Sequence, residues 1–184
     1  QNLSAVAATV TSTGGKVTGY VQQAALRGLT PSGVDLVAGN ASASNTQVIP
    51  GVWIDNKNNS AKLSKDDKSL VPQLHVAAAG AQGAGYKVKV LGASGEVAAS
   101  FEQNLAASSN AASVLNLDQL AGGYYTLVVE ADAPVTASVK MVRGADPKDA
   151  SDTAWAVSSN PLAGNQVMPL SANGTGKFVI AATD

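Results

Sequence analysis

The sequence predicts an all-β protein of immunoglobulin-like β-sandwich repeats, with antiparallel sheets and little or no helix. Three observations predict this fold class. Many short segments alternate apolar and polar side chains with a period of two, turn signals separate these segments at intervals of roughly 8–12 residues, and parts of the chain repeat one another. An α/β fold would instead show strands alternating with long helical patterns.

Segments with strand-like alternation occur along the whole chain. They are 5–11, 17–26, 34–38, 47–54, 73–79, 86–91, 96–103, 112–117, 124–131, 135–143, 153–158, 167–170 and 177–182. The segment YVQQAALR (Tyr20–Arg27) has the propensity of a helix turn or two. Its repeat counterpart, SVKMVR at 138–143, alternates with β-branched residues, so we predict a strand for both.

The internal repeat has an offset of about 118 residues. VTGYV at 17–21 resembles VTASV at 135–139, and QVIP at 47–50 matches QVMP at 166–169, with offsets of 118 and 119. LHVAA at 74–78 resembles FVIAA at 178–182 with an offset of 104, because the first copy carries about 15 extra residues. These extra residues are polar and rich in lysine, which predicts an exposed insertion loop over 53–70.

The repeat predicts three regions. Residues 1–70 are a partial repeat that ends in the insertion loop, residues 71–143 are a complete immunoglobulin-like sandwich, and residues 144–184 are a second partial repeat. We expect 144–184 to pack with 1–52 as a second sandwich, which the length of the chain allows.

The end of the central unit has the sequence pattern of a tyrosine corner. LNLDQLAGGYYTLVV at 115–129 places a tight turn before a strand, and a tyrosine near the start of such a strand bonds back across the corner. By alternation Tyr125 shares a face with Leu127 and Val129, so we predict this structural role for Tyr125.

Two long segments resemble a domain family of unknown function in secreted or envelope-attached actinobacterial proteins. They are GGYYTLVVEADAPVTASVKMVRG…DTAWAVSSNP at 122–161 and VTGYVQQAALRGLTPSGVDLVAGNASASNTQVIPGV at 17–52. Both resemble the family's order of a D-x-P-V-x-A strand turn, an Ala-Trp segment and a V-x-P strand. The resemblance covers most of the chain outside 53–70. It implies modularity and a location outside the cytoplasm, and it supplies no activity and no site residues.

Composition narrows the classes of function. Charged residues make up 14% of the chain, against roughly 25% in an ordinary soluble domain, and the net charge is −1. The composition argues against nucleic-acid binding, because no basic stripe is available for phosphate contacts. No apolar run reaches the roughly 20 residues that span a bilayer, so we expect no direct membrane insertion in this segment.

The beginning of the chain and its cysteine content fit an exported protein. The chain opens directly in strand-like sequence, so we expect a shortened segment of a longer protein that is extracellular or attached to the cell envelope. Cysteine is absent, and a secreted protein of this size has enough core to fold without disulfides.

No constellation of residues predicts an enzyme or a cofactor. His75 is the single histidine, and its place in an alternating strand predicts a solvent-facing or edge residue rather than the base of a catalytic triad. One histidine and no cysteine exclude metal sites of the His/Cys type. The glycine-rich stretch 80–85 lies between two predicted strands, which favours a hairpin loop over a phosphate-binding loop.

A weak calcium candidate remains in the loop after the central unit. Asp146, Asp149 and Asp152 offer three carboxylates, but the run lacks the glycine and the bidentate glutamate of a calcium loop. An ordinary solvated loop is therefore the favoured interpretation of these residues.

Trp53 and Trp155 are the candidate binding residues in a chain with 4% aromatic residues. The repeat places Leu36 at the position equivalent to Trp155, and an exchange between leucine and tryptophan favours a core position. Trp53 borders the insertion loop and is the better candidate for an exposed contact.

These observations predict a non-catalytic structural or interaction module of a larger envelope protein. Its expected partners are other domains of the same protein, envelope proteins or glycans, and its oligomeric state is left open. The alternative is a carbohydrate-binding module for cell-wall glycans that uses Trp53 or the tyrosines as a platform.

Overall fold

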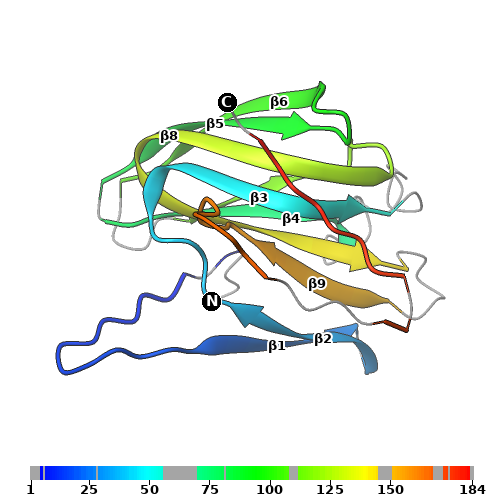
Figure 1. Ribbon diagram of the computed structural model, residues 1–184, viewed down its shortest axis with the longest axis horizontal. Helices are drawn as coiled ribbons and strands as arrows, with labels where there is room; N and C mark the ends of the chain where they lie inside the picture. The colour runs from blue at the N-terminus through cyan, green and yellow to red at the C-terminus, as the bar shows by residue number, and fades with distance from the viewer. Residues whose placement is uncertain are drawn as a thin grey trace.

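The computed structural model describes residues 5, 7–27, 29–55, 70–80, 82–107, 112–144, 151–167, 172–173 and 175–182. Within these ranges the prediction of an all-β protein with antiparallel sheets is confirmed, and no helix is present. The strands are β1 (Tyr20–Arg27), β2 (Thr30–Ala38), β3 (Ser44–Ile54), β4 (Gln73–Ala78), β5 (Ala84–Leu91), β6 (Val97–Leu105), β7 (Ala112–Asn116), β8 (Gly123–Arg143) and β9 (Asp152–Val157) (Figure 1). YVQQAALR is the strand β1, as its repeat counterpart predicts.

β8 organises the main sheet, because it is 21 residues long and belongs to two layers. Its first half pairs with β5 on one edge and with β3 on the other. Its second half pairs with β4 and β9. β6 pairs with the far edge of β5, and β7 pairs with the far edge of β4. The first layer therefore consists of β3, the first half of β8, β5 and β6. The second layer consists of β9, the second half of β8, β4 and β7.

The two layers pack face to face around one hydrophobic core. Alternate residues of the strands are buried, as in β5, where Tyr86, Val88 and Val90 point inward and Lys87 and Lys89 outward. The largest fully buried apolar side chains come from both layers: Ile49, Val52, Ile54, Val71, Leu74, Val76, Val88, Val90, Leu117, Leu127 and Val129. A hydrogen bond of 2.5 Å between the hydroxyls of Tyr86 and Ser113 joins β5 of one layer to β7 of the other.

The segment Asp132-Ala133-Pro134 is a crossing point between the layers. The sequence predicts a turn between two strands here, and this prediction is wrong, because the chain continues as the single strand β8. The pairing with β5 ends at Ala131 and the pairing with β4 begins at Val135, so the missing N–H of Pro134 leaves no gap in either ladder. The Pro134 carbonyl and the Asp132 carboxylate accept hydrogen bonds from the backbone N–H groups of Ala79 and Gly85.

The glycine-rich stretch 80–85 also differs from its prediction as a hairpin loop. It connects β4 to β5, and these two strands lie in different layers and do not pair with each other. The hairpin prediction failed because neighbouring strands in the sequence were assumed to pair.

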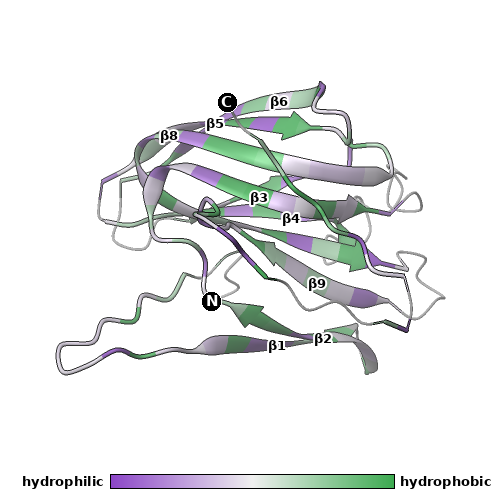
Figure 2. Cartoon of the chain, in the orientation of Figure 1, coloured by the Kyte–Doolittle hydropathy of each residue, from purple (hydrophilic) through white to green (hydrophobic). Residues whose placement is uncertain are grey.

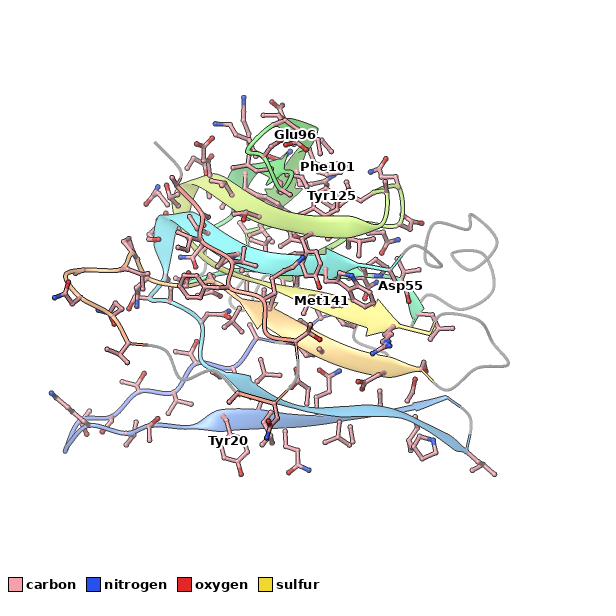
Figure 3. All side chains as sticks on the ribbon, turned by 45° about the vertical axis from the view of Figure 1, so that its right-hand side comes forward. Tyr20, Asp55, Glu96, Phe101, Tyr125 and Met141 are labelled. Carbon is pink, nitrogen blue, oxygen red and sulfur yellow. The ribbon has the colours of Figure 1, made fainter. Side chains whose placement is uncertain are left out.

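Tyr125 lies near the start of β8, two residues after Gly123. Its hydroxyl donates a hydrogen bond of 2.9 Å to the carbonyl oxygen of Ala121, four residues earlier, and its ring packs against the core (Figure 3). We expect Tyr125→Phe to lower the free energy of unfolding by about 1 kcal/mol, the net value of one hydrogen bond. Urea unfolding measures the change, with Tyr124→Phe as the matched control at the neighbouring position. Equal stability of the two variants would contradict a role for the corner bond.

The main sheet extends beyond residues 71–143 in both directions. β3 and β9 lie on either side of the predicted central unit in the sequence, and each pairs with β8. Residues 5 and 7–11 and residues 177–182 form no strand, although both segments were predicted as strands. Val167 is outside any strand too, and 168–170 fall outside the described residues. Most of the predicted insertion loop, 56–69, is likewise outside them.

β1 and β2 form a separate two-stranded hairpin that lies beside β9 (Figure 1). The register of this hairpin is the register of β8 and β9, displaced by the repeat offset. Val21 pairs with Val37 as Val139 pairs with Ala156, Gln22 with Leu36 as Lys140 with Trp155, and Ala24 with Val34 as Val142 with Thr153. The sequence repeat is therefore also a structural repeat of the hairpin formed by β8 and β9.

Candidate contact surfaces

A polar seam joins the hairpin to β9. The backbone N–H of Trp155 donates to a carboxylate oxygen of Asp35 at 2.7 Å, and its indole N–H donates to the side-chain oxygen of Gln23. The Thr153 hydroxyl donates to the Ser32 carbonyl at 3.2 Å. The edge of β9 that β8 does not use is thus bonded to side chains and to a carbonyl of the hairpin.

Close packing at Gly33 permits this seam. Its φ of +114° lies in a region that residues with a side chain rarely adopt. A Cβ at this position would lie 2.5 Å from Oδ1 of Asp152 and 2.6 Å from the backbone nitrogen of Thr153. Gly33 therefore allows β2 to approach the first residues of β9.

His75 lies under Trp155 on the second layer. β4 is an interior strand between β7 and β8, so the predicted edge position of His75 is wrong. Its side chain does lie on the face opposite to the buried Leu74 and Val76, but Trp155 covers it there. The imidazole meets the Trp155 indole edge to face, with ring centroids 4.9 Å apart and an interplanar angle of 64°. Its Nε2 atom is buried and has no hydrogen-bond partner among the described residues.

Burial and, to a smaller degree, the positive charge of Lys140 lower the pKa of His75 from 6.5 to about 4. His75 is therefore a neutral aromatic packing residue at neutral pH. Trp155 is half-buried between β4 and the hairpin, so it contacts the rest of its own chain on both sides.

The lowered pKa of His75 predicts a loss of stability in acid. The unfolded chain takes up the proton near pH 6.5, whereas the folded chain takes it up only near pH 4. The stabilisation from neutral His75 is therefore complete above pH 6.5 and is lost as the pH falls towards 4. Because the ring is partly exposed, we expect a loss of about 1 to 2 kcal/mol rather than the full value of the shift.

Urea unfolding at pH 7.5 and pH 4.5 tests this prediction in the parent chain and in His75→Gln. On acidification, the free energy of unfolding of His75→Gln should fall by about 1 to 2 kcal/mol less than that of the parent chain. An NMR titration of the single histidine with a midpoint near pH 6.5 would contradict the account.

The hairpin presents an exposed apolar face on the side away from its seam residues Gln23 and Asp35. We define the outer face by the alternate residues Tyr20, Gln22, Ala24, Leu26, Val34, Leu36 and Ala38. Tyr20, Leu26, Val34 and Leu36 are 67%, 69%, 62% and 61% exposed. Figure 3 shows Tyr20 pointing away from the seven-stranded sheet, and Figure 2 shows hydrophobic stretches on both strands of the hairpin.

A second aromatic surface lies on the first layer. Trp53 and Tyr124 are directly paired across β3 and β8, on the face opposite to the core residues Val52 and Tyr125. Trp53 is half-buried and Tyr124 is 38% exposed. The ammonium group of Lys177 lies 3.5 Å from the centre of the Tyr124 ring, a cation–π contact with the C-terminal segment.

Only one of the three residues of the predicted calcium candidate lies in the described part of the chain. Asp146 and Asp149 lie outside the described residues, and Asp152 accepts a hydrogen bond from the backbone N–H of Thr153. Among the residues that the structure describes, no group of three or more His, Cys, Asp or Glu side chains could hold a metal ion. Nor do those residues include a helix with the length and apolar character needed to cross a membrane.

Sequence reasoning selected Trp53 and Trp155 but missed their partners. The structure keeps the two tryptophans on different layers, with Tyr124 and Lys177 near the first surface and Gln23 and Asp35 at the second. Tyr124 could have been found, because it alternates with the predicted corner residue Tyr125. Gln23 and Asp35 could not, because the packing of the hairpin on β9 has no local sequence signal.

A model of the family of unknown function DUF5719 matches residues 1–184. Among curated proteins, none matches the chain. Two solved structures are similar to this chain. The crystal structure of Thermotoga maritima 1070 has 15% sequence identity and a TM-score of 0.42, and the match covers 63% of this chain and 95% of the Thermotoga chain. The sensory rhodopsin transducer of Anabaena, at 8% identity and a TM-score of 0.41, covers 55% of this chain and 99% of its own.

Proposed function

We propose, from the premise that the chain belongs to the family of unknown function DUF5719, that it is a non-catalytic structural and interaction module of a larger envelope protein outside the cytoplasm. In this proposal the seven-stranded sheet is the scaffold and the hairpin of β1 and β2 makes the contacts. The partners are modules of the same kind.

The observation that carries the proposal is the exposed apolar outer face of the hairpin. Four large apolar side chains, Tyr20, Leu26, Val34 and Leu36, are all more than half exposed on one side of two paired strands. A contiguous exposed apolar surface of this kind is typical of a protein–protein contact site. The low fraction of charged residues and the repeated hairpin support the modular part of the proposal.

Sedimentation velocity over a range of concentrations tests the use of the outer face. The double variant Val34→Thr/Leu36→Thr keeps side chains that favour strands but reduces the apolar surface. We expect reversible association of the parent chain and at least a several-fold weaker association of the variant. Val97→Thr on β6, where the valine is 61% exposed, is the matched control and should associate like the parent chain.

Two outcomes would overturn the proposal. In the first, the parent chain remains monomeric at the highest concentration that stays soluble. In the second, Val97→Thr weakens association as much as the hairpin variant does, which would show that the outer face has no special role.

Glycan binding is the second candidate function, and the pairing of Trp53 with Tyr124 favours it. Neighbouring aromatic rings on a sheet face offer the flat apolar surface on which sugar rings stack. We expect Trp53→Ala to abolish any retention of the chain on insoluble cell-wall polysaccharide. Trp155→Phe should keep it, because Trp155 is engaged with His75 and Gln23. The absence of retention for the parent chain would remove this candidate.

A further inference from the structure

The hairpin has one edge without a partner strand. In the described part of the chain, β1 pairs only with β2. The structurally equivalent half of β8 pairs with β9 on one edge and with β4 on the other. The second edge of β1 therefore corresponds to the edge of β8 that pairs with β4. An open edge of this kind accepts a further strand.

The same chain contains a second version of the β4 sequence. LHVAA at 74–78 lies in β4, and FVIAA at 178–182 resembles it. The second version forms no strand, and Phe178 and Ile180 are 51% and 69% exposed.

This C-terminal segment does not lie near β1 of its own molecule. Lys177 contacts the Tyr124 ring, and a Cβ on Gly51 would lie 3.9 Å from Cγ2 of Val179. Figure 1 shows the segment crossing β3 and β8, with β9 and β2 between it and β1. A copy of this segment that pairs with β1 in the manner of β4 therefore belongs to another molecule.

We propose that residues 177–182 of one copy add to the open edge of β1 in a second copy, as an antiparallel strand. The proposal rests on the proposed function and names its partner. The contact joins two different surfaces of the same chain, so each copy offers one edge and one strand, and copies associate head to tail into rings or open chains.

The structural repeat fixes the register of this contact. In the main sheet Gln73 pairs with Lys140, His75 with Ser138 and Ala77 with Thr136. The repeat equivalents of the β4 residues lie 104 positions later, and those of the β8 residues lie 118 positions earlier. The equivalent register pairs Lys177 with Gln22, Val179 with Tyr20 and Ala181 with Thr18. On the opposite face Phe178 then lies beside Val21, as Leu74 lies beside Val139 in the core.

The added strand covers apolar surface on both partners. Phe178 and Ile180 are exposed on the C-terminal segment, and Tyr20 and Val21 are 67% and 59% exposed on β1. New backbone hydrogen bonds supply affinity, and the alternation of side chains supplies the register.

Disulfide formation between single-cysteine variants tests the register, because the natural chain has no cysteine. Equal amounts of Tyr20→Cys and Val179→Cys are mixed under mild oxidation, and the cross-linked heterodimer is measured. Directly paired residues of an antiparallel ladder fall within the Cα separation that a disulfide needs. The matched control mixes Val21→Cys with Val179→Cys, in which a one-residue slip places the two sulfurs on opposite faces.

We expect about tenfold more cross-linked heterodimer from the Tyr20 pair than from the Val21 pair, because the register of the strand fixes the face of each side chain. The double variant Tyr20→Cys/Val179→Cys in one molecule should form no internal disulfide at high dilution. Circular dichroism of each variant confirms that the sheet is retained.

Other results would overturn the inference in distinguishable ways. Equal cross-linking of both pairs shows random collision, and an internal disulfide at high dilution shows pairing within one molecule. No cross-linking together with association in sedimentation rejects this register but leaves the proposed function intact. No cross-linking and no association reject both.

Discussion

Leu127→Ala is expected to lower the free energy of unfolding by about 3 to 5 kcal/mol, the upper part of the range for large-to-small core substitutions. Leu127 is fully buried in the first half of β8, and its strand is paired with β3 on one edge and β5 on the other. The surrounding strands are fixed by these ladders, so they cannot collapse into the cavity that the substitution leaves.

Urea unfolding followed by circular dichroism measures this loss. Leu36→Ala on the outer face of the hairpin is the matched control, because the same atoms are removed from a leucine that is 61% exposed. It should change the stability by less than about 0.5 kcal/mol. Comparable losses for Leu127→Ala and Leu36→Ala would contradict the placement of the core between the two layers.

Gly33→Val is expected to release the hairpin from β9 while the seven-stranded sheet stays folded. The substitution adds side-chain atoms where the backbone nitrogen of Thr153 already lies 2.6 Å from the Cβ position, at a φ of +114°. Backbone strain alone costs about 1 to 3 kcal/mol, and the hydrogen bonds of the seam are lost as well. We therefore expect the docking of the hairpin to weaken by about 3 kcal/mol or more.

Fluorescence of Trp155 reports this release. In a Trp53→Phe background Trp155 is the single tryptophan, and its emission should shift to the red when the indole loses Gln23 and becomes solvated. Gly95→Val is the control, because Gly95 also has a positive φ, of +88°, but a Cβ there would meet no atom within 4 Å. We expect the emission of Gly95→Val to stay unchanged. If the emission of Gly33→Val also stays unchanged, Gly33 does not govern the docking of the hairpin.

Much of the fold could be predicted from alternation and turns. β4, β5 and the strand character of YVQQAALR follow from the period of two and from the repeat, because these signals are local. The continuity of β8 through Asp132-Ala133-Pro134 could not be predicted, because the same residues suit a turn and a crossing between layers. What decides between them is the pairing with β3, β4, β5 and β9, which is not local.

The contact surfaces too could be predicted only where they depend on residues close together in the sequence. Trp53 was selected because it borders a polar loop, and its place on the outer side of β3 follows from alternation with the buried Val52. The environment of Trp155 depends on a strand, β4, and a hairpin that are distant in sequence. Leu36 is its repeat equivalent but is largely exposed, because no further hairpin in the described residues covers that side of β2.

In our proposal the seven-stranded sheet is a scaffold and the hairpin makes the contacts between modules. Hydrogen exchange read by mass spectrometry at low and at high protein concentration tests it most directly. We predict that concentrating the protein increases protection in 17–27 and in 177–182 and leaves β4, β5 and β8 unchanged. Increased protection confined to β6 or β7, the outermost strands of the two layers, or no change at any concentration, would contradict the claim.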